Sequence, residues 1–402
     1  MRRTQMHLSI CSLSTLRGDL VHTPDTFAPA PSIIVAGSRA DQGPGQREKT
    51  TPYKSNNANL SLAGSSTRLS DASSHARSPG AFPSRSYSFC SDPGENTDPT
   101  KTSGVQHGIL RNLPIHAWSH EASRWTTWYH TPSKATSHID IVTWNVDFKG
   151  QVAAAGRMSC ILDHLRDVVL ANEPQSAVIL LQELNQFSFA SVLEHSWVRK
   201  HFAITPPDTK SWPWPPRYGI ATLVSRQLHV NNAQMLQFHK TLMGRTAVFV
   251  DVSLQPDDDP NVSQHVVRIA NTHLESLSDE GRFRPVQLRA TADILRAPGV
   301  HAGVVGGDMN MVGPADQDIH VAAGLGDAGT DGPDSLTWGF QPRSGRWAPK
   351  RMDRVFYTPS PGFVVEPVKV IGKGLTTADG RWASDHYGLS TRISLRQTET
   401  WQ

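Results

Sequence analysis

The chain has 402 residues, of which 38% are hydrophobic and 19% are charged, and its formal net charge is +3. Both percentages lie below those of compact domains, which argues against a chain that is folded over its full length. The three cysteines are too few and too far apart for a disulfide framework or a cysteine-based zinc site. No apolar run approaches the ~18 residues of a membrane-spanning helix, and the mild positive charge allows a nucleic-acid or phosphorylated substrate without requiring one.

Residues 1–136 are predicted to form a disordered, Ser/Pro-rich N-terminal region. They lack sustained apolar periodicity, so they cannot bury enough surface to offset the entropy of the chain. The tryptophans at the end of this region, Trp118, Trp125 and Trp128, are interpreted as packing it onto the domain that follows. The small number of cysteines favours an intracellular protein, nuclear or cytoplasmic, and the Arg- and Ser-containing start leaves mitochondrial targeting open.

Residues 137–396 are predicted to form one α/β catalytic domain. In chain order, strands are expected at 139–144, 177–181, 219–224, 248–254, 266–270, 304–305, 354–357, 363–371 and 387–395. Helices are expected at 158–169, 189–195 and 285–296, the last with a proline in its first turn. Because strands outnumber helices, two stacked sheets flanked by helices are favoured over a simple parallel wound sheet.

Several of the expected strands end at polar residues, and one strand is preceded by them. These residues are Asn145, Glu183, His273, Asp308 with Asn310, and Asp385 with His386. Strand ends at one rim of a sheet converge in space, so these side chains are expected to gather. Any one of them, taken alone, is more often a solvated loop residue, and only the combination indicates a catalytic site.

The residue types fit metal-assisted hydrolysis of a phosphodiester, which requires charge neutralisation and an activated water. Oxygen ligands suit Mg²⁺, so Glu183 is the expected direct ligand with support from Asn145, and Mn²⁺ is the alternative ion. Asp308 is expected to hold and deprotonate the attacking water. The sequence therefore predicts a metal-dependent phosphoesterase.

Three further residues are expected to act on the phosphate. Asn310 lies two residues after Asp308, on the same side of an extended segment, and can donate to a phosphoryl oxygen. A protonated His386 would place positive charge beside the phosphorus, and Asp353 is the candidate to orient its ring.

These motifs resemble the endonuclease/exonuclease/phosphatase superfamily, and within it the tyrosyl-DNA phosphodiesterases. The resemblance covers about 139–395 and is carried by Thr-Trp-Asn-Val-Asp at 143–147, Leu-Gln-Glu at 181–183, Asn-Thr-His-Leu-Glu-Ser at 271–276, Gly-Asp-Met-Asn at 307–310, Met-Asp-Arg-Val-Phe at 352–356 and Ser-Asp-His-Tyr-Gly-Leu at 384–389. It implies a four-layer αββα sandwich like that of deoxyribonuclease I. It also implies that Asp385 and His273 support the metal and phosphate site.

Residues outside these motifs are the candidates for substrate contacts. The resemblance extends to 242–245, which includes Arg245. Trp212 and Trp214 would either stack on bases or pack within their own proline-rich loop. The basic run Arg343, Arg346, Lys350, Arg351 and Arg354 would contact a phosphate backbone or form a solvated loop. The family usually continues its Gly-Asp-x-Asn motif with Leu-Arg-Asp, whereas Met-Val-Gly follows here. The arginine expected to contact substrate is therefore absent, and Arg245 or Arg351 is the candidate to replace it.

The leading functional hypothesis is a monomeric Mg²⁺-dependent phosphodiesterase that acts on DNA 5′ ends, with 5′-tyrosyl adducts in DNA repair as one candidate substrate. An alternative keeps the fold and changes the substrate to abasic DNA, RNA, an inositol phosphate or sphingomyelin. An inactive scaffold on the same fold is a third reading, which fits poorly because every acidic and amide group that the chemistry requires is present.

Overall fold

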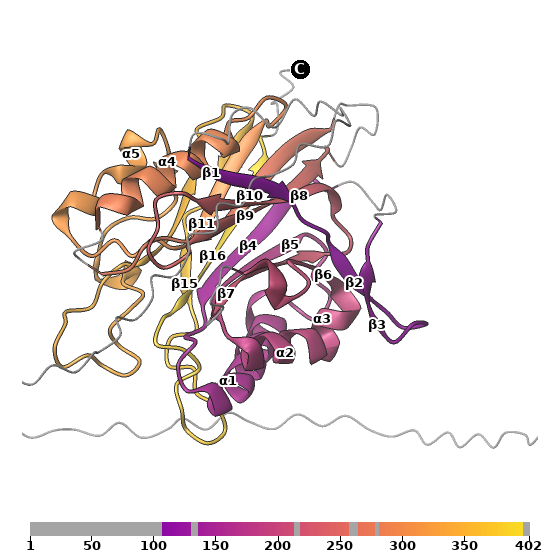
Figure 1. Cartoon of the computed structure of the whole chain (residues 1–402), viewed down its shortest axis with the longest axis horizontal. Helices are drawn as coiled ribbons and strands as arrows, with labels where there is room; N and C mark the ends of the chain where they lie inside the picture. The colour runs from indigo at the N-terminus through magenta and orange to yellow at the C-terminus, as the bar shows by residue number, and fades with distance from the viewer. Residues whose placement is uncertain (1–106, 130–135, 213–217, 257–263, 278–280, 397–402) are drawn as a thin grey trace, which may run out of the picture. The chain divides into compact units, whose positions relative to one another are not determined.

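The computed structural model describes residues 107–129, 136–212, 218–256, 264–277 and 281–396. These residues form two β-sheets that lie face to face, with helices on the two outer sides (Figure 1). One apolar cluster fills the space between the sheets and draws buried residues from both. Two further clusters lie between each sheet and its helices. Among the helices of the described segments, none is both long and apolar enough to cross a membrane.

The first sheet has seven strands, and only one neighbouring pair in it is parallel. The order is β1 (Gly108–Asn112), β8 (His229–Phe238), β9 (Thr246–Leu254), β10 (His265–His273), β11 (Ala302–Asp308), β13 (Asp353–Tyr357) and β12 (Gly326–Asp327). The parallel pair is β10 and β11, and it places His273 opposite Asp308 at the carboxyl ends of both strands. The sheet therefore brings two predicted site residues together.

The second sheet has nine strands and also contains one parallel pair. The order is β14 (Phe363–Val365), β16 (Gly388–Leu395), β4 (His138–Asn145), β5 (Ala177–Leu184), β7 (Gly219–Ser225), β6 (Phe202–Thr205), β2 (His116–Ser119) and β3 (Arg124–Thr127), and β15 (Lys369–Ile371) pairs with β16. The parallel strands β4 and β5 pair Asn145 with Gln182, next to Glu183. Strand β16 starts two residues after His386 and pairs with β4.

Helices cover the outer face of each sheet. On the nine-stranded sheet lie α1 (Gln151–His164), its π-helical continuation (Leu165–Val169), α2 (Gln186–Glu194) and α3 (Ser196–His201). On the seven-stranded sheet lie α4 (Arg284–Leu295) and α5 (Ile319–Ala322), and short 3₁₀ turns occupy Thr209–Ser211, Gly281–Phe283, Pro314–Asp316 and Pro333–Ser335. Asn185 caps α2 in a capping box with Ser188. The αββα sandwich predicted from the sequence is confirmed.

The predicted boundary at residue 136 was set too late. Residues 108–127 contain three strands, and this segment joins the edges of both sheets, because β1 pairs with β8 and β2 pairs with β6. These edge strands are short and largely exposed, so they show no clear apolar alternation. Residues 1–106 and 130–135 lie outside the described residues.

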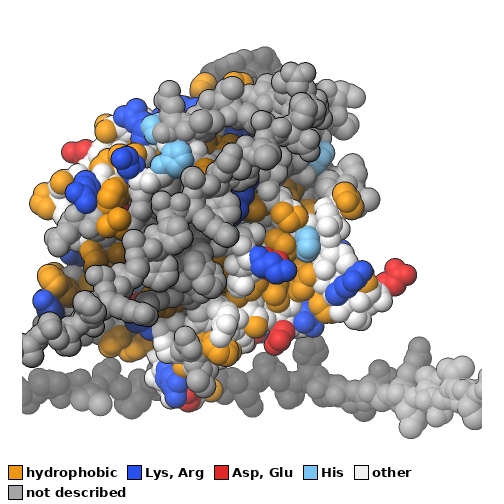
Figure 2. All heavy atoms as spheres, viewed as in Figure 1, with side chains coloured by type: hydrophobic (Ala, Val, Ile, Leu, Met, Phe, Trp, Pro, Cys, Tyr) orange, Lys and Arg blue, Asp and Glu red, His pale blue; other side chains and the backbone are white. Residues whose placement is uncertain are grey.

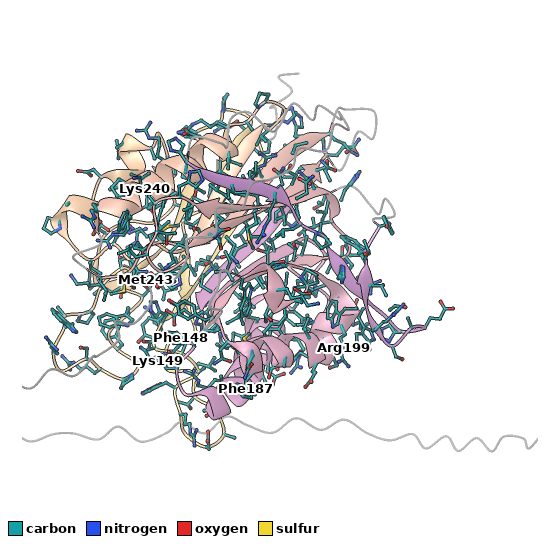
Figure 3. All side chains as sticks on the ribbon, in the orientation of Figure 1. Phe148, Lys149, Phe187, Arg199, Lys240 and Met243 are labelled. Carbon is teal, nitrogen blue, oxygen red and sulfur yellow. The ribbon has the colours of Figure 1, made fainter. Side chains whose placement is uncertain are left out.

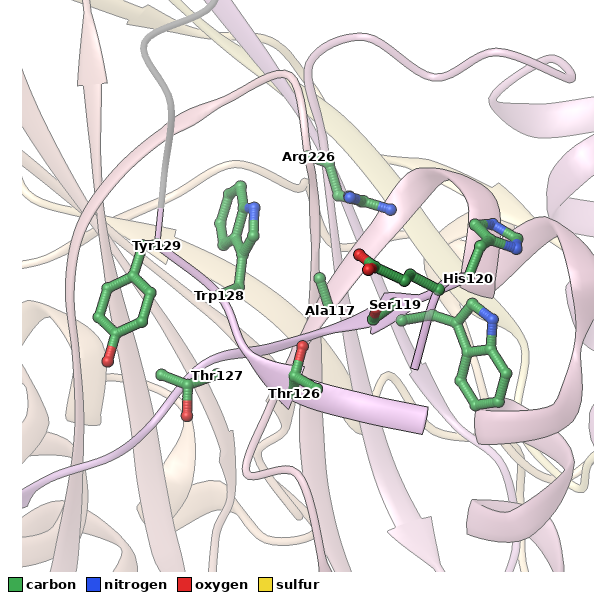
Figure 4. Close-up of a pocket in the computed structure, with 10 residues that line it drawn as sticks. Ala117, Ser119, His120, Thr126, Thr127, Trp128, Tyr129 and Arg226 are labelled. Carbon is green, nitrogen blue, oxygen red and sulfur yellow. The ribbon is translucent and has the colours of Figure 1, made fainter. Parts of the chain in front are cut away.

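The tryptophans of this segment pack onto the domain, as predicted. The indole Nε1 of Trp125 donates to Leu193 O at 3.2 Å, and the guanidinium of Arg199 lies 3.9 Å from the ring centre of Trp118. The hairpin of β2 and β3 also borders a shallow pocket that Trp128, Tyr129 and Arg226 help to line (Figure 4). None of the predicted site residues lines this pocket.

Candidate active site

The predicted catalytic residues meet where the parallel strands of both sheets end. Asp308 ends β11, and Asn145 ends β4 in the facing sheet. The Asn145 Nδ2 donates to Asp308 Oδ2 at 3.0 Å, and its Oδ1 accepts from the backbone N–H of Asp147. A buried hydrogen bond thus joins the two sheets at the site, which is the convergence that the sequence predicted.

Asp308 is a buried carboxylate with both oxygens oriented. Its Oδ1 accepts from the backbone N–H of Asn310 at 2.9 Å, and its side chain is 3% exposed. Burial raises the pKa of Asp308, the positive charge of His386 opposes this, and the negative charge of Asp353 adds to the rise. A fixed carboxylate with a raised pKa is suited to take a proton from a water molecule.

Glu183 lies at an irregularity in β5. The pairing of β5 with β7 shifts register between Leu181 and Leu184, and Glu183 has φ +59, an uncommon angle for a residue other than glycine. Its Oε2 accepts from the backbone N–H of Phe148 at 3.2 Å. Burial raises the pKa of Glu183, and the charges of Asp385 and Asp308 act in the same direction. The ionised form therefore requires a positive partner.

His386 is paired with Asp353, as predicted. The Nδ1 of His386 lies 2.7 Å from Asp353 Oδ2, and both side chains are buried. Burial alone would lower the pKa of His386, but the charge and hydrogen bond of Asp353, with further help from Asp308, raise it well above its ordinary value. The raised pKa favours the cationic form of the ring, whose Nε2 lies 3.9 Å from Asp308 Oδ2.

His273 is a second buried histidine, but it is neutral. Its Nδ1 lies 2.9 Å from Arg245 Nη1, and because a guanidinium can only donate, this nitrogen must be the acceptor and Nε2 must carry the proton. Burial lowers the pKa of His273 well below its ordinary value, and the charges of Arg245 and His386 act in the same direction. The Nε2 lies 3.4 Å from Asp308 Oδ2 and 3.9 Å from Glu183 Oε1.

Asn310 is held in a left-handed conformation with φ +49. Its Nδ2 donates to Leu274 O at 3.0 Å, and its Oδ1 accepts from Ser276 Oγ at 3.0 Å. One N–H of the amide thus remains for a substrate oxygen, which agrees with the predicted role as a donor.

Asp385 lies at the rim of the same site. Its Oδ2 is 3.6 Å from Lys149 Nζ and accepts from Trp338 Nε1 at 3.4 Å, and its Oδ1 is 3.9 Å from His386 Nε2. Lys149 is exposed and lies beside Phe148, in the same part of the molecule as Met243 (Figure 3).

The donor set fits a hard divalent cation. Carboxylate oxygens of Glu183 and Asp308 lie within 4.8 Å of each other, whereas His273 carries its proton on the nitrogen that faces them and so offers no lone pair to a cation in this tautomer. Carboxylates crowded in a buried site raise each other's pKa, and a cation held by their oxygens would remove that repulsion.

Trp212 and Arg351, which were predicted to contact substrate, are engaged within the fold. Trp212 is buried, packs on Phe189 and donates from Nε1 to Ile220 O, so its faces are not available to a base. Trp214 lies outside the described residues. Arg351 is buried and forms a two-point ion pair with Asp327, so it is a structural residue. The sequence alone does not predict these contacts, because Phe189 and Asp327 lie 23 and 24 residues from the side chains that they contact.

Arg245 does lie at the site, but it is already engaged. It is buried, it donates to His273, and its guanidinium carbon lies 5.4 Å from the ring centre of Tyr218. Tyr218 in turn stacks on Phe148 with ring centres 4.3 Å apart. Sequence reasoning missed Tyr218, because no motif marks it and its partner lies 70 residues away.

Sequence reasoning also missed two residues that hold the site loops. Arg157 of α1 donates to the Asp147 carboxylate and to the backbone oxygens of Asp147 and Lys149. Glu275 is fully buried and accepts from Thr241 Oγ1 and from the backbone N–H groups of Leu242 and Met243. The only signal for Glu275 was its place in the segment 271–276.

The model of the Endonuclease/Exonuclease/phosphatase family matches residues 142–386, which leaves β1, β2, β3 and β16 outside the matched range. No curated protein matches the sequence.

Solved structures of TDP2 share the fold. A humanized D. rerio TDP2 with 14 mutations is 19% identical, with a TM-score of 0.51, and the match covers 64% of this chain and 100% of that chain. A truncated Caenorhabditis elegans TDP2 is 22% identical, with a TM-score of 0.51 and coverage of 64% and 98%. D. rerio TDP2 complexed with a single-strand DNA product is 19% identical, with a TM-score of 0.51 and coverage of 64% and 99%.

Proposed function

Because the chain belongs to the endonuclease/exonuclease/phosphatase family, whose members hydrolyse phosphoesters, we propose that it is a Mg²⁺-dependent phosphodiesterase acting on the 5′ ends of DNA. The observation that carries the proposal is the buried set of Asn145, Glu183, Asp308 and the His386–Asp353 pair around one point. The set combines an oriented carboxylate base, a cationic imidazole and oxygen ligands for a metal.

Each side chain has a distinct part in the proposed reaction. Asp308 takes the proton of the attacking water, and the hydrogen bonds from Asn145 and Asn310 hold its two oxygens in place. Protonated His386 donates from Nε2 to a phosphoryl oxygen as negative charge develops there. Asp353 keeps that ring charged and oriented.

Glu183 would hold the metal, with Asp385 at the rim and Asn145 beside it. When bound, Mg²⁺ would neutralise charge on the phosphoryl and leaving oxygens. The neutral His273 lies 3.4 Å from Asp308 Oδ2 and 3.9 Å from Glu183 Oε1, and it brings no second positive charge that would compete with the metal for these carboxylates.

The proposed substrate is a DNA 5′ end, with 5′-tyrosyl adducts as the first candidate. Support comes from the fold shared with TDP2, including a TDP2 structure that is complexed with a single-strand DNA product. At these identities the likeness is one of fold, so abasic DNA, RNA, inositol phosphates and sphingomyelin remain outcomes of the test.

A single assay panel tests the proposal. Purified protein is incubated with a 5′-tyrosyl oligonucleotide, an abasic duplex, an RNA oligonucleotide, a phosphoinositide and sphingomyelin, each in Mg²⁺, in Mn²⁺ and in EDTA. We expect turnover of the 5′-tyrosyl oligonucleotide in Mg²⁺ and none in EDTA. Turnover of only a lipid or inositol substrate would overturn the DNA assignment and leave the hydrolytic core intact.

The catalytic assignment is tested with matched carboxylate variants. Asp308→Asn removes the proposed base and is expected to lower kcat by about 10²–10⁴, and Glu183→Gln is expected to weaken metal binding. Glu173→Gln is the control, because Glu173 lies before β5 begins, at the strand end opposite Glu183. Unchanged metal-dependent rates for both site variants would show that the site is elsewhere.

A further inference from the structure

Some basic residues of the run at 343–354 form ion pairs within the fold, and others are available to bind an anionic ligand. Arg351 and Arg354 are buried and share the carboxylate of Asp327. The exposed Arg346 lies over the ring of Trp347. On the face in Figure 2, the Lys and Arg side chains of the described residues are scattered among hydrophobic and neutral ones. Affinity for a polyanion on such a surface depends on individually placed cations.

Lys350 is the member of the run that lies beside the catalytic segment. Its Nζ donates to Val312 O at 2.7 Å. Val312 is two residues beyond Asn310, a chain distance of at most about 7 Å. The ammonium group therefore lies next to the loop that leaves the catalytic strand β11.

The backbone of Lys350 is tied to the same site from the other side. Lys350 and Trp338 exchange two backbone hydrogen bonds of 3.0 Å. Trp338 also forms a β-bridge with His386, and its Nε1 donates to Asp385. Lys350 is thus linked through Trp338 to His386, the proposed phosphate-binding histidine.

The charge of Lys350 has no counter-ion within the part of the chain that the structure describes. Its side chain is partly buried, and an ammonium group has three N–H donors, of which one is used by a neutral carbonyl. By contrast, Lys149 and Lys200 each lie 3.6 Å from a carboxylate. Holding a partly desolvated cation without an anion is costly, so the position favours an anionic ligand.

We propose that Lys350 binds a phosphate of the substrate strand next to the phosphate that is hydrolysed. The inference rests on the proposed function, since it takes a nucleic-acid strand as the substrate. Lys350 then contributes to the binding of long substrates and not to the chemical step. A substrate with one phosphodiester has no group for Lys350 to bind.

The test measures binding and turnover separately. Binding of a fluorescein-labelled single-stranded oligonucleotide is followed by anisotropy at several salt concentrations, with Asp308→Asn as the background so that the strand is not cleaved. Lys350→Met is expected to weaken binding about tenfold at low salt and to reduce the slope of log Kd against log salt by about 0.7, the value for one lost phosphate contact. Lys350→Arg should retain most of the affinity.

The controls separate this inference from the proposed function. Lys200→Met removes the same charge from α3, near Glu173 at the opposite strand ends, and should leave the salt slope unchanged. In the otherwise wild-type protein, Lys350→Met should leave turnover of thymidine 5′-p-nitrophenyl phosphate within about twofold. If it proves unstable, Lys350→Gln replaces it.

Equal affinity and salt slope for Lys350→Met and Lys200→Met would overturn the inference, even if the enzyme hydrolyses DNA. The inference would also be overturned if Lys350→Met lost turnover of thymidine 5′-p-nitrophenyl phosphate by the same factor as it lost affinity for the oligonucleotide. That result would place Lys350 in the chemical step or in the fold. A parent protein that neither binds nor cleaves DNA would overturn the proposed function and the inference with it.

Discussion

Replacing Asp353 with asparagine separates the charge of the His386–Asp353 pair from its geometry. The carboxylate is fully buried, its Oδ2 lies 2.7 Å from His386 Nδ1, and its Oδ1 has no partner among the described residues. An asparagine has nearly the same shape, and its amide oxygen can still accept from Nδ1. The substitution therefore removes one negative charge and leaves an orienting hydrogen bond available.

The expected loss of kcat follows from the groups that keep the His386 ring charged. Asp353 is the largest contribution that raises the pKa of His386, and burial acts against it. Without that carboxylate the pKa of His386 falls, so a smaller fraction of the ring is protonated at a given pH. Loss of one preorganised donor to a developing oxyanion typically costs about 10²–10³ in kcat, or about 3–4 kcal/mol in the barrier.

The direction in which the pH profile of kcat should shift follows from the protonation of His386. A protonated His386 supports the reaction below its pKa, and this support is lost as pH rises through the pKa. The alkaline limb of kcat in Asp353→Asn should therefore lie at lower pH than in the wild type, and acid should restore part of the rate. The assay is a series of pH–rate profiles on thymidine 5′-p-nitrophenyl phosphate at saturating Mg²⁺, with circular dichroism to verify folding.

A remote buried pair provides the control. Asp251 and Arg268 form a two-point ion pair between β9 and β10, so Asp251→Asn should lower stability without moving the pH profile. If Asp353→Asn lowers kcat by the same factor at every pH, Asp353 only orients the ring and our account of its charge is wrong. An unchanged kcat would show that the reaction does not depend on the charge of Asp353.

Two further substitutions test the supports of the site. Arg157→Met removes three hydrogen bonds to the loop that follows Asn145 and carries the Phe148 N–H. We expect Mn²⁺ binding, measured by isothermal titration calorimetry, to be about 10–100-fold weaker. An unchanged affinity would refute this role of Arg157. Gly388→Ala places a Cβ 2.7 Å from Trp144 Cδ2; we expect a loss of about 1–3 kcal/mol in the free energy of unfolding in urea, whereas wild-type stability would mean that the indole can move aside.

The catalytic core could be predicted because its residues are local features of strands. Asn145 and Asp308 each end a continuous buried run, and such runs are visible in the sequence. Glu183 was found for the same reason, although nothing in its neighbours shows that it adopts φ +59 at a bulge. Residue identity and strand position were therefore predictable, whereas backbone conformation required the pairing of β5 with β7.

The errors arose where tertiary partners decide the outcome. The sequence suggested that Arg351 is a free cation, but Asp327, 24 residues away, binds it at two points. Trp212 looked like a stacking platform, but Phe189 covers it. Strand β8 escaped prediction because its register shifts between Val230 and Asn232, which breaks the apolar alternation.

The two buried histidines show how partners decide function at equal burial. His386 and His273 approach the same oxygen of Asp308, at 3.9 Å and 3.4 Å. A carboxylate faces Nδ1 in His386 and a guanidinium faces it in His273, so the first ring is held as a cation and the second as a neutral ring. Two cationic rings would pair with Asp308 and compete with a metal for its oxygens. One cationic and one neutral ring would leave a carboxylate charge for a metal while still supplying a proton to the phosphate, which fits the metal-dependent reaction that we propose.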